Sequence, residues 1–119
     1  LRERRLNLPV YMLDTPNLEI PRHDVCICFD VIEHCDADTQ LSIIHKCAEI
    51  GETVFMNLIR GNGTELDKLH FPVDIDKITN YVFTNWPAWY KDYYADDNGV
   101  FRQRLLIYGD GVKLEGITK

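Results

Sequence analysis

The chain has 119 residues, of which 45% are hydrophobic, and a formal net charge of −6. This length suits one modest domain spanning 1–119, and the apolar content is typical of a globular protein rather than a disordered one. The negative charge disfavours broad nonspecific binding to nucleic acid, which needs clustered Lys and Arg side chains. No apolar run approaches the roughly 20 residues that a membrane span requires, so we expect no membrane partner.

The N-terminal segment predicts the end of a helix followed by a short strand. Leu1–Leu8 is typical of a helix that Pro9 stops, and Val10–Leu13 is a short apolar run that ends in Asp14. The first residue is Leu1 rather than a methionine, which suggests a processed chain or a part of a longer one.

A strand, a helix and a second strand follow. Val25–Phe29 is a continuous apolar run, which predicts a central strand buried on both faces of a parallel sheet. Asp36 or Asp38 can cap the next helix by accepting backbone N–H bonds, and Gly51 ends it. Thr53–Leu58 is β-branched and apolar and predicts the next strand. The apolar residues at helical spacing between these strands are Leu41, Ile44, Cys47 and Ala48. The pattern indicates a βαβ crossover in a parallel sheet.

The C-terminal half predicts a loop, a short helix and a hairpin. Arg60–Thr64, with two glycines, favours a loop, and Asp74 is placed to cap a short helix. The residues expected on one face of that helix are Ile75, Ile78 and Val82. Asp96–Gly99 is a turn sequence that favours positive φ, and it predicts an antiparallel hairpin between strands at Ala88–Tyr94 and Phe101–Tyr108.

The four cysteines are expected to be free thiols. They are Cys26, Cys28, Cys35 and Cys47. Cys26 and Cys28 lie within an apolar run, where cysteine behaves as a small buried residue. We therefore expect a reducing, cytoplasmic setting. A zinc site built from Cys26, Cys28, His34 and Cys35 is disfavoured, because the spacing is not that of a zinc knuckle.

The stretch Asp24–His34 (DVCICFDVIEH) resembles the fourth-strand motif of class I S-adenosylmethionine-dependent methyltransferases. Upstream, Val10–Asp14 resembles the third strand of that family and its terminal acid. Downstream, Gly51–Asn57 resembles the fifth strand, and the closing hairpin is similar to the antiparallel pair of the family. The resemblance implies an α/β fold: a truncated, Rossmann-like methyltransferase sheet, with parallel strands followed by a C-terminal antiparallel hairpin.

The resemblance also implies roles for individual residues, with S-adenosylmethionine as the cofactor. Asp14 would accept a hydrogen bond from the adenine amino group. The loop after the fourth strand borders the methionine part of the cofactor and the methyl acceptor, which assigns Asp30 and Val31 to cofactor binding. Methyl transfer requires alignment of the acceptor and, where the acceptor carries a proton, a nearby base. Glu33 or His34 could serve as that base.

Three further residues are candidates for contact with the methyl acceptor. Ile32 lies in the same loop, Asn57 ends the next strand, and His70 belongs to the segment Arg60–Phe71, where we expect acceptor specificity to reside. Ligands of open α/β sheets bind at the carboxyl ends of the strands, where Asp14, Asp30 and Asn57 all fall. The acceptor itself, a small molecule or a biopolymer, is not indicated by the sequence.

The most specific element of the family is missing. The chain has no Gly-x-Gly loop after a first strand, because its glycines begin at Gly51. Without the first two strands, Val10–Leu13 has no neighbour in its usual place and one edge of Val25–Phe29 is bare. An N-terminal half could lie elsewhere, the two strands could pair directly, or two chains could cover each other's edges.

Two alternatives to an enzyme of this type stay open. The chain could be a non-catalytic, methyltransferase-like module that serves in binding or assembly. It could also be a metal-dependent RNA 2′-O-methyltransferase, since Asp30, Glu33 and His34, with His70 more distant, resemble the metal set of those enzymes. However, Asp30 replaces the first Glu of that set and the same Glu-His pair occurs in relatives without metal, so we predict no metal site.

Overall fold

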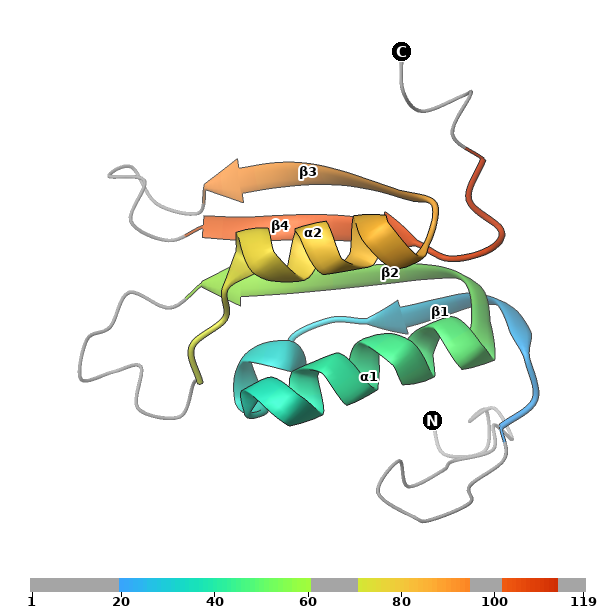
Figure 1. Cartoon of the computed structure of the whole chain (residues 1–119), viewed down its shortest axis with the longest axis horizontal. Helices are drawn as coiled ribbons and strands as arrows, with labels where there is room; N and C mark the ends of the chain where they lie inside the picture. Colours follow the sequence, from blue (N-terminus) through green and yellow to red (C-terminus); the bar gives the residue numbers. More distant parts are fainter. Residues whose placement is uncertain (1–19, 61–70, 95–101, 114–119) are drawn as a thin grey trace, which may run out of the picture.

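The computed structural model describes residues 20–60, 71–94 and 102–113, which form a four-stranded mixed sheet with two helices (Figure 1). The strands lie in the order β1-β2-β4-β3. β1 pairs with β2 in parallel, and β4 runs antiparallel to both β2 and β3. In chain order the elements are β1 (His23–Cys28), a 3₁₀ turn (Ile32–His34), α1 (Ala37–Ile50), β2 (Gly51–Arg60), α2 (Ile75–Asn85), β3 (Ala88–Tyr94) and β4 (Arg102–Tyr108).

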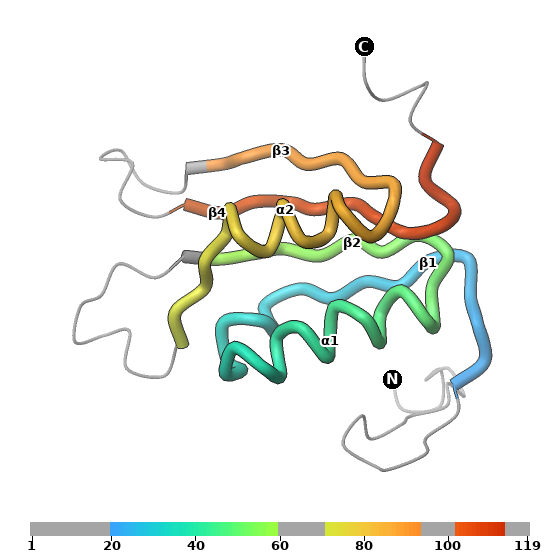
Figure 2. The backbone as a smooth tube through the Cα atoms, viewed as in Figure 1, coloured from blue at the N-terminus to red at the C-terminus, as the bar shows by residue number. Residues whose placement is uncertain are grey.

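This arrangement confirms the predicted α/β class and the parallel strand–helix–strand unit, whose path Figure 2 traces from β1 through α1 into β2. The closing antiparallel pair is confirmed as well. The predicted loop beginning at Arg60 is wrong at that residue, because β2 continues to it in pairing with β4. The predicted helix end Leu1–Leu8, the strand Val10–Leu13 and the turn Asp96–Gly99 lie outside the described residues.

Both helices begin at aspartate caps. The Asp36 side chain accepts a hydrogen bond from the Thr39 backbone N–H at 2.9 Å, so the cap of α1 is Asp36 and not Asp38. This hydrogen bond holds the pKa of Asp36 below its usual value. Asp74 caps α2 in the same way through the Lys77 N–H at 3.1 Å. Each cap satisfies one of the donors that a helix start leaves unpaired.

The two helices lie on the same face of the sheet. On β4 the side chains of Arg104 and Tyr108 point to one face, because residues four apart in a strand share a face. Arg104 contacts Thr79 of α2, and Tyr108 contacts Ile44 of α1. The core therefore forms between this face and the helices (Figure 1). Its most deeply buried side chains are Tyr108, Ile32, Ile44, Met56, Leu58, Leu106, Val54 and Val82.

The other face of β1 is open, which corrects the expectation that this strand is buried on both sides. Val25 is 49% exposed and Ile27 is 66% exposed, whereas Cys26 and Cys28, which point toward α1, are half-buried and buried. Phe29, just after the strand, is 48% exposed. The continuous apolar run reflects hydrophobic residues on both faces, but in the described part of the chain helices cover only one of them.

Tyr108 joins the sheet to α1, and its hydroxyl group allows a test of that contact. The buried hydroxyl donates a hydrogen bond of 2.8 Å to the Ile44 carbonyl oxygen, and burial raises the pKa of this phenol. We expect Tyr108→Phe to lower the free energy of unfolding by about 1 kcal/mol, since the ring packing is kept and one buried hydrogen bond is lost. Urea denaturation of both proteins measures the difference; unchanged stability would contradict a stabilising bond.

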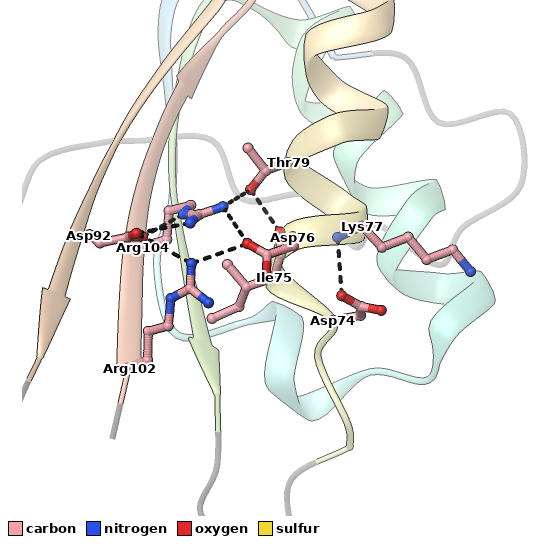
Figure 3. Close-up of polar contacts among 8 residues, drawn as sticks. All are labelled: Asp74, Ile75, Asp76, Lys77, Thr79, Asp92, Arg102 and Arg104. Atoms are coloured by element: carbon pink, nitrogen blue, oxygen red, sulfur yellow. Dashed lines mark hydrogen bonds and ion pairs between the residues drawn. The ribbon is translucent and has the colours of Figure 1, made fainter. Parts of the chain in front are cut away.

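A charged cluster ties α2 to the hairpin (Figure 3). Arg104 is only 3% exposed, and its guanidinium group forms two hydrogen bonds to Asp92, Nε–Oδ1 at 2.5 Å and Nη2–Oδ2 at 2.9 Å. Nη1 donates to Thr79 Oγ1 at 2.8 Å, and the group lies over the Tyr90 ring, 4.0 Å from its centroid. The buried cation thus has acceptors in Asp92 and Thr79 and a ring in Tyr90, the kind of partners that a buried charge requires.

Candidate functional site

The candidate site lies in the loop that leaves β1 at its carboxyl end. Asp30 has a φ of 61°, the only positive φ of a non-glycine residue in the described part of the chain. Aspartate and asparagine tolerate this left-handed conformation better than other side chains. The chain therefore reverses sharply just after β1, and the loop 29–36 turns back over the ends of the parallel strands toward α1.

Asn57 of β2 holds this turn in place. Its Oδ1 accepts a hydrogen bond from the Asp30 backbone N–H at 2.7 Å, and its Nδ2 donates one to Asp30 Oδ1 at 3.0 Å. Asn57 is 7% exposed, whereas Asp30 is exposed. Asp30 Oδ2 has no hydrogen-bond partner among the described residues. The pair therefore presents one fixed, solvent-facing carboxylate oxygen at the carboxyl end of β1, beside the parallel strand β2.

Two further hydrogen bonds fix the rest of the loop. The Glu33 carbonyl oxygen accepts from the Phe71 N–H at 2.7 Å. Gln40 Nε2 donates to the Cys35 carbonyl oxygen at 2.8 Å and to the Pro72 carbonyl oxygen at 3.1 Å. The loop is thus tied to the segment that leads into α2. Gln40 was not predicted, although a polar residue on the buried face of α1, one turn before Ile44, is a signal that sequence inspection can detect.

Glu33 and His34, the two candidate bases, have opposite environments. The Glu33 side chain is 3% exposed and the His34 side chain is 51% exposed, and Glu33 Oε2 lies 3.6 Å from His34 Nε2. Glu33 Oε1 is buried without a hydrogen-bond partner in the described part of the chain. A buried carboxylate oxygen that lacks a partner is costly and marks a position to explain by function. Of the two, only His34 is accessible to a ligand in this conformation.

The remaining candidates are distributed as follows. Val31 is half-buried and stands between Asp30 and the first residue of the 3₁₀ turn. Ile32 is fully buried in the hydrophobic core, so it cannot contact an acceptor in this conformation. Asp14 and His70 lie outside the described residues. The structure therefore brings together Asp30 and Asn57 by direct hydrogen bonds, with Val31, Glu33 and His34 on the same short loop.

Within the ranges that the structure describes, no group of three or more His, Cys, Asp or Glu side chains is arranged to hold a metal ion. Asp30, Glu33 and His34 do not form such a group there, and His70 lies outside those ranges. Neither described helix has the length and apolar character of a membrane span.

Comparison with known proteins adds no assignment to this geometry. No family model, no curated protein and no solved structure matches the chain.

Proposed function

We propose that this chain forms part of a methyltransferase that uses S-adenosylmethionine, with the loop 29–36 facing the cofactor and the methyl acceptor. The observation that supports this most is the Asp30–Asn57 pair, which presents a fixed carboxylate at the carboxyl end of β1, held by the neighbouring strand β2. Open α/β sheets bind their ligands at that edge. The sequence resemblance of Asp24–His34 independently assigns the same loop to the same role.

The residues of this chain could contact only some parts of such a cofactor. S-adenosylmethionine supplies a methyl group on a positively charged sulfonium. The exposed Asp30 carboxylate provides a negative charge and an acceptor for a cationic or hydrogen-donating part of that ligand, and Val31 provides an apolar neighbour. Asp14 would serve the adenine. The chain has no Gly-x-Gly loop ahead of the Asp24–His34 motif, where the family carries it, so the remaining contacts would come from an N-terminal half or a second chain.

On the acceptor side, His34 is the residue that we assign as general base. Its imidazole is half-exposed and lies beside the buried Glu33 carboxylate, which can orient it. Asn57 fixes the position of Asp30 rather than acting on the acceptor itself, and His70 stays a candidate for acceptor contact. The acceptor class, small molecule or biopolymer, follows from no residue in the loop. We also retain the cytoplasm as the proposed location.

A non-catalytic, methyltransferase-like module is the second candidate. The observation that favours it is the full burial of Ile32 and Glu33, because both then stabilise the loop rather than contact a ligand. In this case the loop would be a structural element and the chain would act through binding or assembly.

Calorimetric titration with S-adenosylmethionine and with its demethylated product separates the two candidates. The first predicts binding of the cofactor by the chain at millimolar ligand. Asp30→Asn keeps the left-handed turn and the acceptor for Asn57 but removes the charge, and we expect it to weaken binding roughly tenfold. Asp24→Asn, an exposed acid just before the apolar run of β1 and away from the loop, is the matched control and should leave affinity unchanged.

Absence of binding by the wild-type chain would exclude catalysis by this chain alone, but it would not exclude activity in a longer parent chain. Equal weakening by Asp30→Asn and Asp24→Asn would show that the effect is one of net charge and not of the loop.

A further inference from the structure

Three of the four cysteines meet between β1 and α1, away from the solvent-facing carboxylate of the proposed site. Cys26 and Cys28 are two positions apart on β1, so both side chains point to the face that α1 covers. Cys47, near the end of α1, lies in the same buried cluster as Cys28, and Cys26 packs against that cluster. Gly51, whose N–H donates to the Cys47 carbonyl oxygen, lies against Cys26, since a Cβ at Gly51 would be 2.5 Å from the Cys26 Cβ. All three are free; Cys28 and Cys47 are buried and Cys26 is half-buried.

The geometry of the strand selects which thiols can form a disulfide. Residues two apart on a strand are separated by about 6.6 Å and their side chains run parallel, which is unfavourable for a direct bond between Cys26 and Cys28. Cys47 lies on α1, across from β1, and packs in the same cluster. Within the described ranges these thiols belong to no arrangement that could hold a metal ion. Thiol–disulfide chemistry through Cys47 is therefore the reaction that this placement favours.

Exposure and hydrogen bonding distinguish the roles of the two partners. Cys26 is the most accessible of the three thiols, so a small oxidant reaches it first. The neighbouring Cys47 side chain lowers the pKa of Cys26 to about 7 and lowers the pKa of Cys28 as well, while the pKa of Cys47 is raised. Of the two thiols with a lowered pKa, Cys28 is buried and Cys26 is the accessible one. The thiolate is the nucleophilic form of cysteine, so Cys26 is the attacking group. By contrast, burial raises the pKa of Cys35, which belongs to the loop after β1.

We propose that Cys26 and Cys47 form a peroxide-oxidisable pair that closes a disulfide between β1 and α1. The Cys26 thiolate attacks one oxygen of a hydroperoxide, the O–O bond breaks, and the released oxygen takes a proton to leave as water or an alcohol. Cys26 is then a sulfenic acid. The Cys47 sulfur attacks the Cys26 sulfur, the S–O bond breaks, and hydroxide leaves as water with the Cys47 proton. Two thiols lose two electrons in total, and the peroxide gains them.

The disulfide would enclose residues 26–47, and this ring contains the whole loop 29–36. Oxidation therefore restrains the segment that carries Asp30 without altering Asp30 itself. This inference does not depend on the proposed methyltransferase function, because it concerns only the chemistry of the thiols.

Peptide mapping tests the proposal on the wild-type chain. The reduced protein is treated with a small excess of hydrogen peroxide, blocked with N-ethylmaleimide and digested with trypsin without reduction. The sequence places Cys47 alone in the peptide Cys47–Arg60 and the other three cysteines in His23–Lys46. We expect these two peptides to be joined, with the loss of two hydrogen atoms. Unlinked peptides after oxidation would overturn the proposal.

Single variants assign the partner within His23–Lys46. Cys26→Ser should abolish the link, whereas Cys35→Ser, the matched control, should leave it intact. With Cys47→Ala, oxidation should stop at a Cys26 sulfenic acid that a cyclic 1,3-diketone traps. In the unmodified chain, Cys26 should react with iodoacetamide at pH 7 roughly tenfold faster than Cys35. A disulfide link that survives in Cys26→Ser would refute the assignment of Cys26 as the partner of Cys47. Faster reaction of Cys35 than of Cys26 would refute it as well, and neither result needs the Cys47 variant.

Discussion

Asp92→Ala should lower the free energy of unfolding by about 3 kcal/mol, because it leaves a buried cation without its main partner. Asp92 accepts two hydrogen bonds from the Arg104 guanidinium group, whose side chain is 4% exposed. Thr79 and the Tyr90 ring remain in contact with Arg104 in the variant, but neither carries a negative charge. Asp76 keeps an ion pair of 3.2 Å to Arg104 from the exposed side. The loss is therefore large but not complete.

Urea denaturation of the wild type and the variant measures this difference. The matched control is Asp110→Ala, which removes an exposed ion pair, Arg22 Nη2 to Asp110 Oδ2 at 3.4 Å, with side chains 41% and 72% exposed. Exposed pairs contribute little, so the control should change stability by about 0.5 kcal/mol or less. Equal effects of the two substitutions would mean that burial of Arg104 does not determine the cost.

The Asp92–Arg104 pair also makes the free energy of unfolding depend on pH in the acid range. Hydrogen bonds from Arg104 hold the pKa of the Asp92 carboxyl below its usual value. The contribution of this pair to the free energy of unfolding is therefore fully present above the unfolded-state pKa of Asp92, about 4. It is lost as the pH falls through the lower pKa of Asp92 in the folded protein. The stability difference between wild type and Asp92→Asn should be greatest near neutral pH and shrink below about pH 4. A difference independent of pH would contradict an ionic contribution.

Gly109→Ala is the second substitution for which we expect a large effect, a destabilisation of about 3 kcal/mol. Gly109 has a φ of +129°, which side chains rarely adopt, and a Cβ there would lie 2.3 Å from the Glu52 carbonyl oxygen. That oxygen belongs to the backbone of β2, so it cannot move away as a side chain can. The turn after β4 packs against the start of β2 at this point, and its Gly111 N–H donates to the same oxygen at 2.8 Å.

Gly111→Ala provides the comparison within the same turn. Its nearest neighbour would be the Thr53 side-chain oxygen at 2.9 Å, which can rotate away, and its φ lies outside the left-handed region. We expect a loss below about 1 kcal/mol, measured by the same denaturation experiment. If Gly111→Ala were as damaging as Gly109→Ala, a general lack of space in the turn would replace backbone conformation as the cause.

Local signals in the sequence were sufficient for most of the elements. Asp36 and Asp74 precede apolar residues at helical spacing, and both cap a helix. Caps and periodicity depend on neighbours within a few residues, which the sequence contains directly. The open face of β1 could not be predicted in this way. The run Val25–Phe29 shows how apolar the strand is, whereas the burial of each face of β1 depends on where the helices pack.

The site was predictable in position but not in geometry. Asp30 was identified as a residue after a strand, because motif and strand pattern indicate that end. Asn57 was expected to end the next strand, and this is wrong, because β2 continues past it to Arg60 in pairing with β4. Their mutual hydrogen bonds and the left-handed turn depend on the register between β1 and β2, which a local pattern does not contain. Glu33 was a candidate base, yet its side chain is buried. Arg104 was not singled out, since nothing in its neighbourhood in the sequence distinguishes a buried arginine from a surface one.

The Asp92–Arg104 pair also has a consequence for the choice between alternative hairpins. The two residues are direct cross-strand partners. A slip of β4 by a single position would turn Arg104 to the opposite face of the sheet and would expose apolar residues of β4. In such a mispaired hairpin, Asp92 would lie beneath α2 without its partner. In an Arg104→Leu variant the same slip would cost less free energy, because the leucine side chain has no hydrogen-bond partner to lose. The buried charge thus penalises the wrong structures more than it rewards the right one.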